Sequence, residues 1–261
     1  MKILVLDYDG VLVDSAKESF AVAFNLYIRQ HGFKHNINEP LSYRNFHRID
    51  NELKDLEANF NKLRAYCDIS CSFLSVLAAL DRQKIINNKK EFENFINKTQ
   101  DYPKMGILFH KERERLINEN FDAFLKLTPA HKEIVDGVKR LFNLETEVFI
   151  ASKNKKELLI KVLDANGFKI PEEHIYDAYR ADNKKEAVQK IIEELELKYN
   201  NVMFIDDNLK YLIPIAKMGV KTFLAEWGFV TQEDIEEAER QGIEVLSKQV
   251  FYQKIREELN Q

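Results

Sequence analysis

Short apolar runs alternate with amphipathic segments in two parts of the chain. Four runs have the length and composition of buried strands: Ile3–Leu6, Glu147–Ala151, Asn201–Ile205 and Val220–Leu224. Helical periodicity characterises the segments around the later runs: Lys132–Leu144, Lys155–Asn166, Lys184–Leu197 and Leu209–Met218. Gly167 and Gly219 follow two of these segments at the place of a helix C-terminal cap. Alternating strands and helices predict an α/β fold with a parallel, doubly wound sheet.

The stretch between the first and second apolar runs has a different pattern. Apolar residues recur there at three- and four-residue spacing over several segments: Ala16–His31, Tyr43–Ala65, Ile69–Leu80, Phe92–Ile96 and Ile107–Leu127. No glycine occurs between Gly32 and Gly106, which suits a bundle of helices. We therefore predict a helical domain at 16–128, inserted into a core domain made of 1–15 and 129–261. Toward the end of the core we expect a helix at Thr231–Glu239 and a polar helix after Val245.

Composition and charge narrow the class of protein. The chain has 261 residues, 45% hydrophobic and 31% charged, as is typical of a globular protein with one large domain or two modest ones. A net charge of −4 without a basic run argues against nucleic-acid binding. No apolar stretch approaches the roughly 20 residues of a membrane span, and the N-terminus lacks a signal-peptide layout. We therefore expect a cytoplasmic protein that contacts no membrane. Cys67 and Cys71, four apart in a helical pattern, are expected to be buried reduced thiols.

Polar side chains follow the strand-like runs at the points where they end. Asp7 and Asp9 follow the first, Ser152 the second, and Asp206 with Asp207 the third, while Lys184 opens a helical segment. Functional sites of open α/β sheets form outside the carboxyl ends of the strands, so these groups should converge. Two carboxylates at the mouth of a buried strand repel each other unless a cation lies between them. A hard, oxygen-binding cation such as Mg²⁺ is the simplest candidate.

The order and content of these motifs resemble the haloacid dehalogenase-like (HAD) superfamily of hydrolases. The run Asp-Tyr-Asp-Gly-Val-Leu-Val-Asp-Ser at residues 7–15 is similar to its first motif, and Ser152, Lys184 and the Asp206–Asp207 pair to its second, third and fourth. The resemblance covers residues 1–15 and about 129–229 and implies a Rossmann-like core. The 16–128 insert occupies the position of that family's helical cap. The Ser-Lys-Asn segment after Ala151 and Glu226-Trp227-Gly228 are most similar to phosphoglycolate-phosphatase-type members.

The resemblance also implies roles for the motif residues. Asp7 would be the nucleophile that forms an aspartyl-phosphate, and Asp9 the acid and base that serves the leaving oxygen and the attacking water. Mg²⁺ would bind the Asp7 side chain, the Asp9 backbone carbonyl, Asp206 and Asp207, with Asp207 as the main ligand of that pair. Ser152 would bind a phosphoryl oxygen, and Lys184 would hold the phosphoryl group and the Asp7 carboxylate in register, with Lys185 as an alternative to Lys184. The expected partner is a small phosphorylated metabolite.

The sequence leaves other activities possible, and it departs from the family pattern in two places. A phosphomutase or phosphotransferase would use the same Asp7 and Asp9, and a non-catalytic phosphate-sensing protein could retain the site. Dehalogenation is disfavoured, because ester formation from an alkyl halide needs neither a metal nor an acid such as Asp9. Many family members have an acid at the position of Tyr211. The insert is also longer than the usual four-helix cap, and the sequence names neither the substrate nor the oligomeric state.

Overall fold

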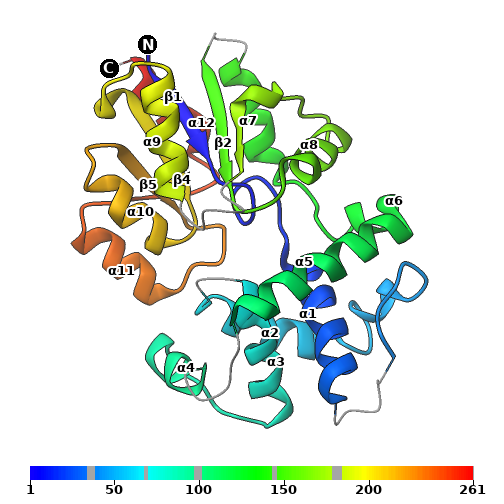
Figure 1. Ribbon diagram of the computed structural model, residues 1–261. Helices are drawn as coiled ribbons and strands as arrows, with labels where there is room; N and C mark the ends of the chain where they lie inside the picture. Colours follow the sequence, from blue (N-terminus) through cyan, green and yellow to red (C-terminus); the bar gives the residue numbers. More distant parts are fainter. Residues whose placement is uncertain (34–38, 68–69, 97–101, 143–145, 178–183, 261) are drawn as a thin grey trace. The chain divides into compact units, whose positions relative to one another are not determined.

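Two compact units make up the chain in the computed structural model, which describes residues 1–33, 39–67, 70–96, 102–142, 146–177 and 184–260 (Figure 1). One unit combines Met1–Asp14 with Pro129–Gln261 and is called the core domain below. The other, Ser15–Thr128, is called the inserted domain. The predicted boundaries lay after residue 15 and before residue 129, so the first junction differs from the prediction by one residue.

The core domain is built on a six-stranded parallel sheet, which confirms the predicted fold class. The strand order is β3-β2-β1-β4-β5-β6. Strand β1 (Ile3–Leu6) lies inside the sheet, with Ile3 opposite Glu147 of β2 (Glu147–Ser152) on one side and Val202 of β4 (Val202–Asp206) on the other. All four residues of β1 are buried, because helices cover both faces of the sheet, and this explains its continuous apolar run.

The strands differ from the sequence prediction in number and at their ends. Strand β5 (Lys221–Ala225) corresponds to a predicted run, whereas β3 (Ile175–Asp177) and β6 (Glu244–Leu246) were missed. These two have three residues each and lie at the sheet edges, too short to give a periodic signal. The second and third predicted runs each end one residue later, so Ser152 and Asp206 are strand residues paired with Asp177 and Leu224.

Helices cover the sheet as right-handed crossovers require. For right-handed crossovers, the connections from β1 to β2 and from β2 to β3 lie on one face of the sheet. The connections from β3 to β4, from β4 to β5 and from β5 to β6 lie on the other face. The core helices are α7 (Lys132–Phe142), α8 (Lys156–Ala165), α9 (Lys184–Glu194), α10 (Leu209–Ala216), α11 (Gln232–Arg240) and α12 (Phe251–Asn260). Helices α9 and α10 share a buried cluster with Val5, Phe149 and Phe204. The predicted end of α7 at Leu144 lies outside the described residues.

The inserted domain is helical, as predicted. Its elements are α1 (Ala16–His31), the 3-10 turn Phe46–Arg48, α2 (Lys54–Arg64), the 3-10 turn Ser70–Ser72, α3 (Phe73–Asp81), α4 (Lys89–Ile96), α5 (Tyr102–Glu119) and α6 (Phe121–Leu125). Phenylalanine rings from several of these helices meet edge to face, with Phe60 against Phe20 and Phe73 against both Phe60 and Phe109. These rings tie α1, α2, α3 and α5 into one hydrophobic core.

Three expectations for this domain need correction. A continuous helix over Tyr43–Ala65 is wrong, because a 3-10 turn and further turns precede α2. The helix expected over Ile107–Leu127 is broken at Asn120, whose extended backbone and side-chain bond to the Ala123 N–H start α6. Cys67 is half-buried rather than buried. The expected helix start at Ile69 and the burial of Cys71 lie outside what the structure describes.

No described helix has both the length and the apolar character that a membrane crossing requires.

Candidate active site

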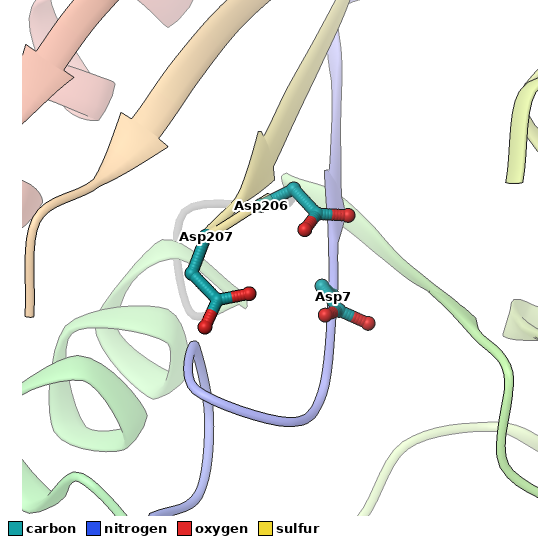
Figure 2. Close-up of side chains that lie close together, drawn as sticks. All are labelled: Asp7, Asp206 and Asp207. Atoms are coloured by element: carbon teal, nitrogen blue, oxygen red, sulfur yellow. The ribbon is translucent and has the colours of Figure 1, made fainter. Parts of the chain in front are cut away.

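Three carboxylates meet at the carboxyl end of the two central strands (Figure 2). Asp7 directly follows β1, and its N–H donates to the Ile205 carbonyl at 2.9 Å. Asp206 is the last residue of β4, and Asp207 follows it. One oxygen from each carboxylate lies within 4.8 Å of the other two. The chain order of the sheet reverses between β1 and β4, so this is the position where open α/β sheets place their sites.

Lys184 provides a positive charge within this group of acids. It is the first residue of α9 and is 3% exposed. Its Nζ lies 2.7 Å from Asp7 Oδ1 and 2.7 Å from Asp206 Oδ2. Of the two candidate lysines, Lys184 is therefore the one whose ammonium contacts the predicted nucleophile.

Burial and mutual contacts shift the pKa values of Asp7, Asp206 and Lys184. Desolvation raises the pKa of Asp7 to about 7, although the Lys184 ammonium opposes the rise. Burial likewise raises the pKa of Asp206 to about 6, against the effect of Lys184. Desolvation alone would lower the pKa of Lys184, but the Asp206 and Asp7 carboxylates raise it above its ordinary value. Lys184 therefore stays charged, and one ammonium does not compensate the desolvation of the acids around it.

Asp207 is fixed by backbone groups on two sides. The Phe229 N–H donates to its Oδ2 at 2.8 Å. A Cβ on Gly10 would lie 2.0 Å from Asp207 Oδ2, and a Cβ on Gly228 would lie 2.3 Å from Asp207 Cβ. Gly10 also has a positive φ of 74°, which residues with an L side chain rarely adopt. The sequence Asp-Gly in the first motif thus gives both the turn and the space that Asp207 occupies.

The three carboxylates fit a hard divalent cation. They supply oxygen ligands from two adjacent strands, and a cation bound among them would offset the desolvation that raises the pKa of Asp7 and Asp206. Asp7, Asp206 and Asp207 are therefore the side chains that could hold a metal ion. Among the described acids, Asp9 does not belong to this cluster.

Asp9 lies two residues after Asp7 and has a different partner. The Asn154 side-chain Nδ2 donates to Asp9 Oδ2 at 2.6 Å. Asn154 is 4% exposed, and its backbone N–H donates to Ser152 Oγ at 3.2 Å. Asn154 thereby connects Asp9 to the predicted phosphate ligand Ser152. Sequence reasoning treated Asn154 only as part of the Ser-Lys-Asn segment, and the signal that could have found it is its position two residues beyond Ser152.

A compact turn carries Asp7 and Asp9. Within it the Gly10 N–H donates to the Val13 carbonyl at 2.9 Å, and the Leu12 N–H to the Tyr8 carbonyl at 2.9 Å. From outside the turn, Trp227 Nε1 donates to the Val11 carbonyl at 3.1 Å. The Trp227 ring packs edge to face against Phe251. Its indole N–H is also an anchor for the turn that holds both catalytic candidates.

An α/β core with a carboxylate centre at the switch point and a helical insert after the first strand defines a hydrolase of the haloacid dehalogenase type. A family model described as haloacid dehalogenase-like hydrolase matches residues 1–219. Because this match spans most of the chain, the protein belongs to that family. No curated protein sequence matched the chain.

Solved structures with the same fold include hydrolases and a mutase. A haloacid dehalogenase-like family hydrolase from Streptococcus pneumoniae is 12% identical, with a TM-score of 0.58 over 95% of this chain and 93% of that one. A predicted phosphatase from Clostridium acetobutylicum is 14% identical, with a TM-score of 0.58 over 98% and 99%. A β-phosphoglucomutase from Clostridium difficile is 16% identical, with a TM-score of 0.58 over 100% and 97%. At these identities the similarity concerns the fold.

Proposed function

We propose that the protein is a Mg²⁺-dependent phosphatase that hydrolyses a small phosphomonoester through an aspartyl-phosphate on Asp7. The observation that carries this proposal is the position of each acid relative to the carboxylate cluster. Asp7, Asp206 and Asp207 cluster at the strand ends, whereas the Asp9 carboxylate lies outside that cluster and accepts a hydrogen bond from Asn154 Nδ2. A carboxylate that is near the nucleophile but outside the metal-binding cluster is suited to proton transfer.

In the first half of the proposed reaction, an Asp7 oxygen attacks the phosphorus of the ester. The bond from phosphorus to the ester oxygen breaks, and Asp9 gives that oxygen its proton, so the alcohol leaves neutral. Lys184, held 2.7 Å from Asp7 Oδ1, keeps the nucleophile oriented and offers positive charge to the phosphoryl oxygens. Ser152 is the hydroxyl donor at the end of β2 that would bind one of these oxygens.

In the second half, Asp9 accepts a proton from water, and the water oxygen attacks phosphorus. The bond between phosphorus and Asp7 breaks, which releases inorganic phosphate and regenerates the Asp7 carboxylate. Mg²⁺ bound by Asp7, Asp206 and Asp207 would offset the repulsion between the Asp7 carboxylate and the dianionic substrate. Every proton transfer in this scheme is assigned to Asp9.

The same features separate hydrolysis of phosphate esters from dehalogenation. A halide leaves as a stable anion and needs no proton, so an enzyme that removes halide has no use for Asp9. The two carboxylates beside the nucleophile, Asp206 and Asp207, would repel an anionic haloacid unless a cation were bound. The proposed substrate is therefore a small phosphorylated metabolite.

The test is release of inorganic phosphate from a panel of small phosphomonoesters, with Mg²⁺ and with EDTA. We expect turnover of at least one ester with Mg²⁺, and loss of activity by at least about a thousandfold in Asp7→Asn, because the nucleophile is removed. Acid quench of the wild type during turnover should trap a phosphoryl group on Asp7.

Other outcomes would favour the alternatives. An isomeric phosphate ester without free phosphate would make the protein a mutase. Stable phosphorylation of Asp7 with negligible turnover across the panel would make it a phosphate-sensing protein. Equal phosphate release by wild type and Asp7→Asn would contradict the proposed nucleophile.

A further inference from the structure

Three lysines surround the Tyr211 ring at the edge of the candidate site, with Lys153 Nζ 5.8 Å and Lys210 Nζ 5.9 Å from the ring centroid. Tyr211 lies in the first turn of α10 and is 7% exposed. The Lys184 ammonium lies over its ring, 4.6 Å from the ring centroid. Its hydroxyl accepts a hydrogen bond from Lys153 Nζ at 3.2 Å. Lys153 directly follows Ser152, so the tyrosine joins the helix after the acidic pair to the segment after β2.

The ring completes the surroundings of the Lys184 ammonium. Asp7 and Asp206 contact Nζ, each at 2.7 Å, and the aromatic ring lies against it as well. A buried ammonium needs a partner in every direction that water no longer reaches. The negative face of an aromatic ring attracts a cation more strongly when the cation is desolvated. The ring does this without adding a carboxylate that would draw Lys184 away from Asp7.

We infer that Tyr211 is a positioning residue, whose ring holds Lys184 against Asp7 and whose hydroxyl holds Lys153 beside Ser152. This inference rests on the proposed phosphatase function. Two ammonium groups then stay near the phosphoryl site without a further negative charge opposing an anionic substrate. The uncharged aromatic side chain thus favours binding of a dianionic phosphoryl group.

The two parts of Tyr211 can be removed separately. Tyr211→Phe keeps the ring and removes the hydroxyl that bonds to Lys153, whereas Tyr211→Leu removes both. With Mg²⁺ present, calorimetry should show that Tyr211→Leu weakens inorganic phosphate binding about tenfold, a factor between those expected for an exposed and a desolvated cation–ring contact. Tyr211→Phe should lose at most about threefold, because Lys184 keeps its ring.

A matched control is available in Tyr176 of β3. The Lys190 ammonium lies 5.7 Å from its ring centroid, and its hydroxyl donates to Glu194, so it is a second tyrosine with a lysine over its ring. Tyr176→Leu should leave phosphate affinity unchanged. A double-mutant cycle of Tyr211→Phe with Lys153→Met tests the hydroxyl, since the two losses should not add if both substitutions break the same bond.

A spectroscopic measurement tests the ring contact without relying on activity. In protein labelled with ¹³C at lysine Cε, the ring current of Tyr211 should shift the Lys184 methylene signal upfield. The signal is assigned by its absence in Lys184→Arg. The upfield shift should persist in Tyr211→Phe and disappear in Tyr211→Leu, and circular dichroism reports whether each variant is folded.

The results separate this inference from the proposed function. A wild type that hydrolyses no phosphomonoester contradicts the function, and the methylene signal and phosphate affinity still test the positioning. The inference is overturned if the wild-type Lys184 signal shows no upfield shift, which requires no variant of Tyr211 to fold. It is also overturned if Tyr211→Leu and Tyr211→Phe bind phosphate equally well.

Discussion

Asn154 is the residue that most changes the interpretation of the proposed proton donor. Its amide donates to the Asp9 carboxylate at 2.6 Å from a nearly buried position, and its backbone bonds to Ser152. A side chain held in this way spends less of its time in orientations that do not serve proton transfer. In the proposed reaction, Asn154 would therefore position Asp9 for protonation of the leaving alcohol, a step that an alkyl phosphate needs and an activated ester does not.

The first prediction follows from this contact. Asn154→Ala should lower kcat for an alkyl phosphate about tenfold, because the alcohol must receive a proton from a poorly oriented Asp9. It should lower kcat for p-nitrophenyl phosphate much less, since that leaving group is stable without a proton. Steady-state kinetics on both esters give the comparison. Equal decreases for the two substrates would show that Asn154 does not act through Asp9.

The second prediction concerns Asp7 and pH. Burial raises the pKa of Asp7 to about 7 in the folded protein, above its ordinary value of 3.8. The folded state therefore binds the proton more tightly than the unfolded state does. This contribution to the free energy of unfolding is fully present below pH 4 and is lost as pH rises through about 7. The Asn side chain of Asp7→Asn resembles the protonated acid and does not titrate, so this variant should not lose that part of the free energy of unfolding as pH rises.

Urea denaturation in EDTA measures this difference. At pH 4 wild type and Asp7→Asn should have similar free energies of unfolding. At pH 8 the variant should be more stable by up to about 4 kcal/mol, at about 1.36 kcal/mol per pKa unit. Asp206 titrates in both proteins and contributes to both curves. Parallel curves from pH 4 to pH 8 would contradict the assigned burial effect.

At the scale of elements, α1 and α5 of the inserted domain are joined by a buried ion pair. Arg113 donates to Glu18 through Nε at 2.7 Å and through a second nitrogen at 2.9 Å, and both side chains are buried. The Arg113 guanidinium also lies over the Phe109 ring at 5.1 Å. The pair thus places two opposite charges between α1 and α5, where neither is exposed to water.

The third prediction tests this pair. Arg113→Met should lower the free energy of unfolding of the inserted domain by about 3–5 kcal/mol, because the Glu18 carboxylate is left buried without its partner. The double variant Glu18→Leu with Arg113→Met should recover most of that loss, since two apolar side chains replace two charges. Urea denaturation followed by circular dichroism measures both. A double variant as unstable as the single one would mean that packing, not charge, is lost.

Elements differ in how far the sequence predicts them. Strand β1 and helix α1 have the predicted bounds, because a four-residue apolar run and a sixteen-residue amphipathic pattern are strong local signals. Strands β3 and β6 were missed, because three-residue edge strands depend on pairing with β2 and β5 rather than on their own pattern. The break at Asn120 was missed because the apolar spacing continues across it while its side chain caps α6.

At the scale of the whole molecule, the chain joins a parallel core domain to a helical inserted domain, and its match to the haloacid dehalogenase-like hydrolases spans residues 1–219. The carboxylates that could hold a metal come from the ends of two neighbouring central strands, although nearly 200 positions separate Asp7 from Asp206 in the chain. The topology of the sheet explains this, because parallel strands end at one edge whatever the length of the chain between them.

The sequence by itself determined the fold class, the inserted helical domain and the set of acids at the strand ends. Those properties follow from local periodicity and from motifs that precede or follow a strand. Only the tertiary structure showed that Lys184 is the lysine at Asp7, that Asn154 Nδ2 donates to Asp9, and that Tyr211 contacts both Lys184 and Lys153. Asn154 and Asp9 are 145 positions apart, and Tyr211 and Lys153 are 58 apart. Such contacts depend on the direction of each side chain at the sheet edge, which hydrophobic periodicity does not specify.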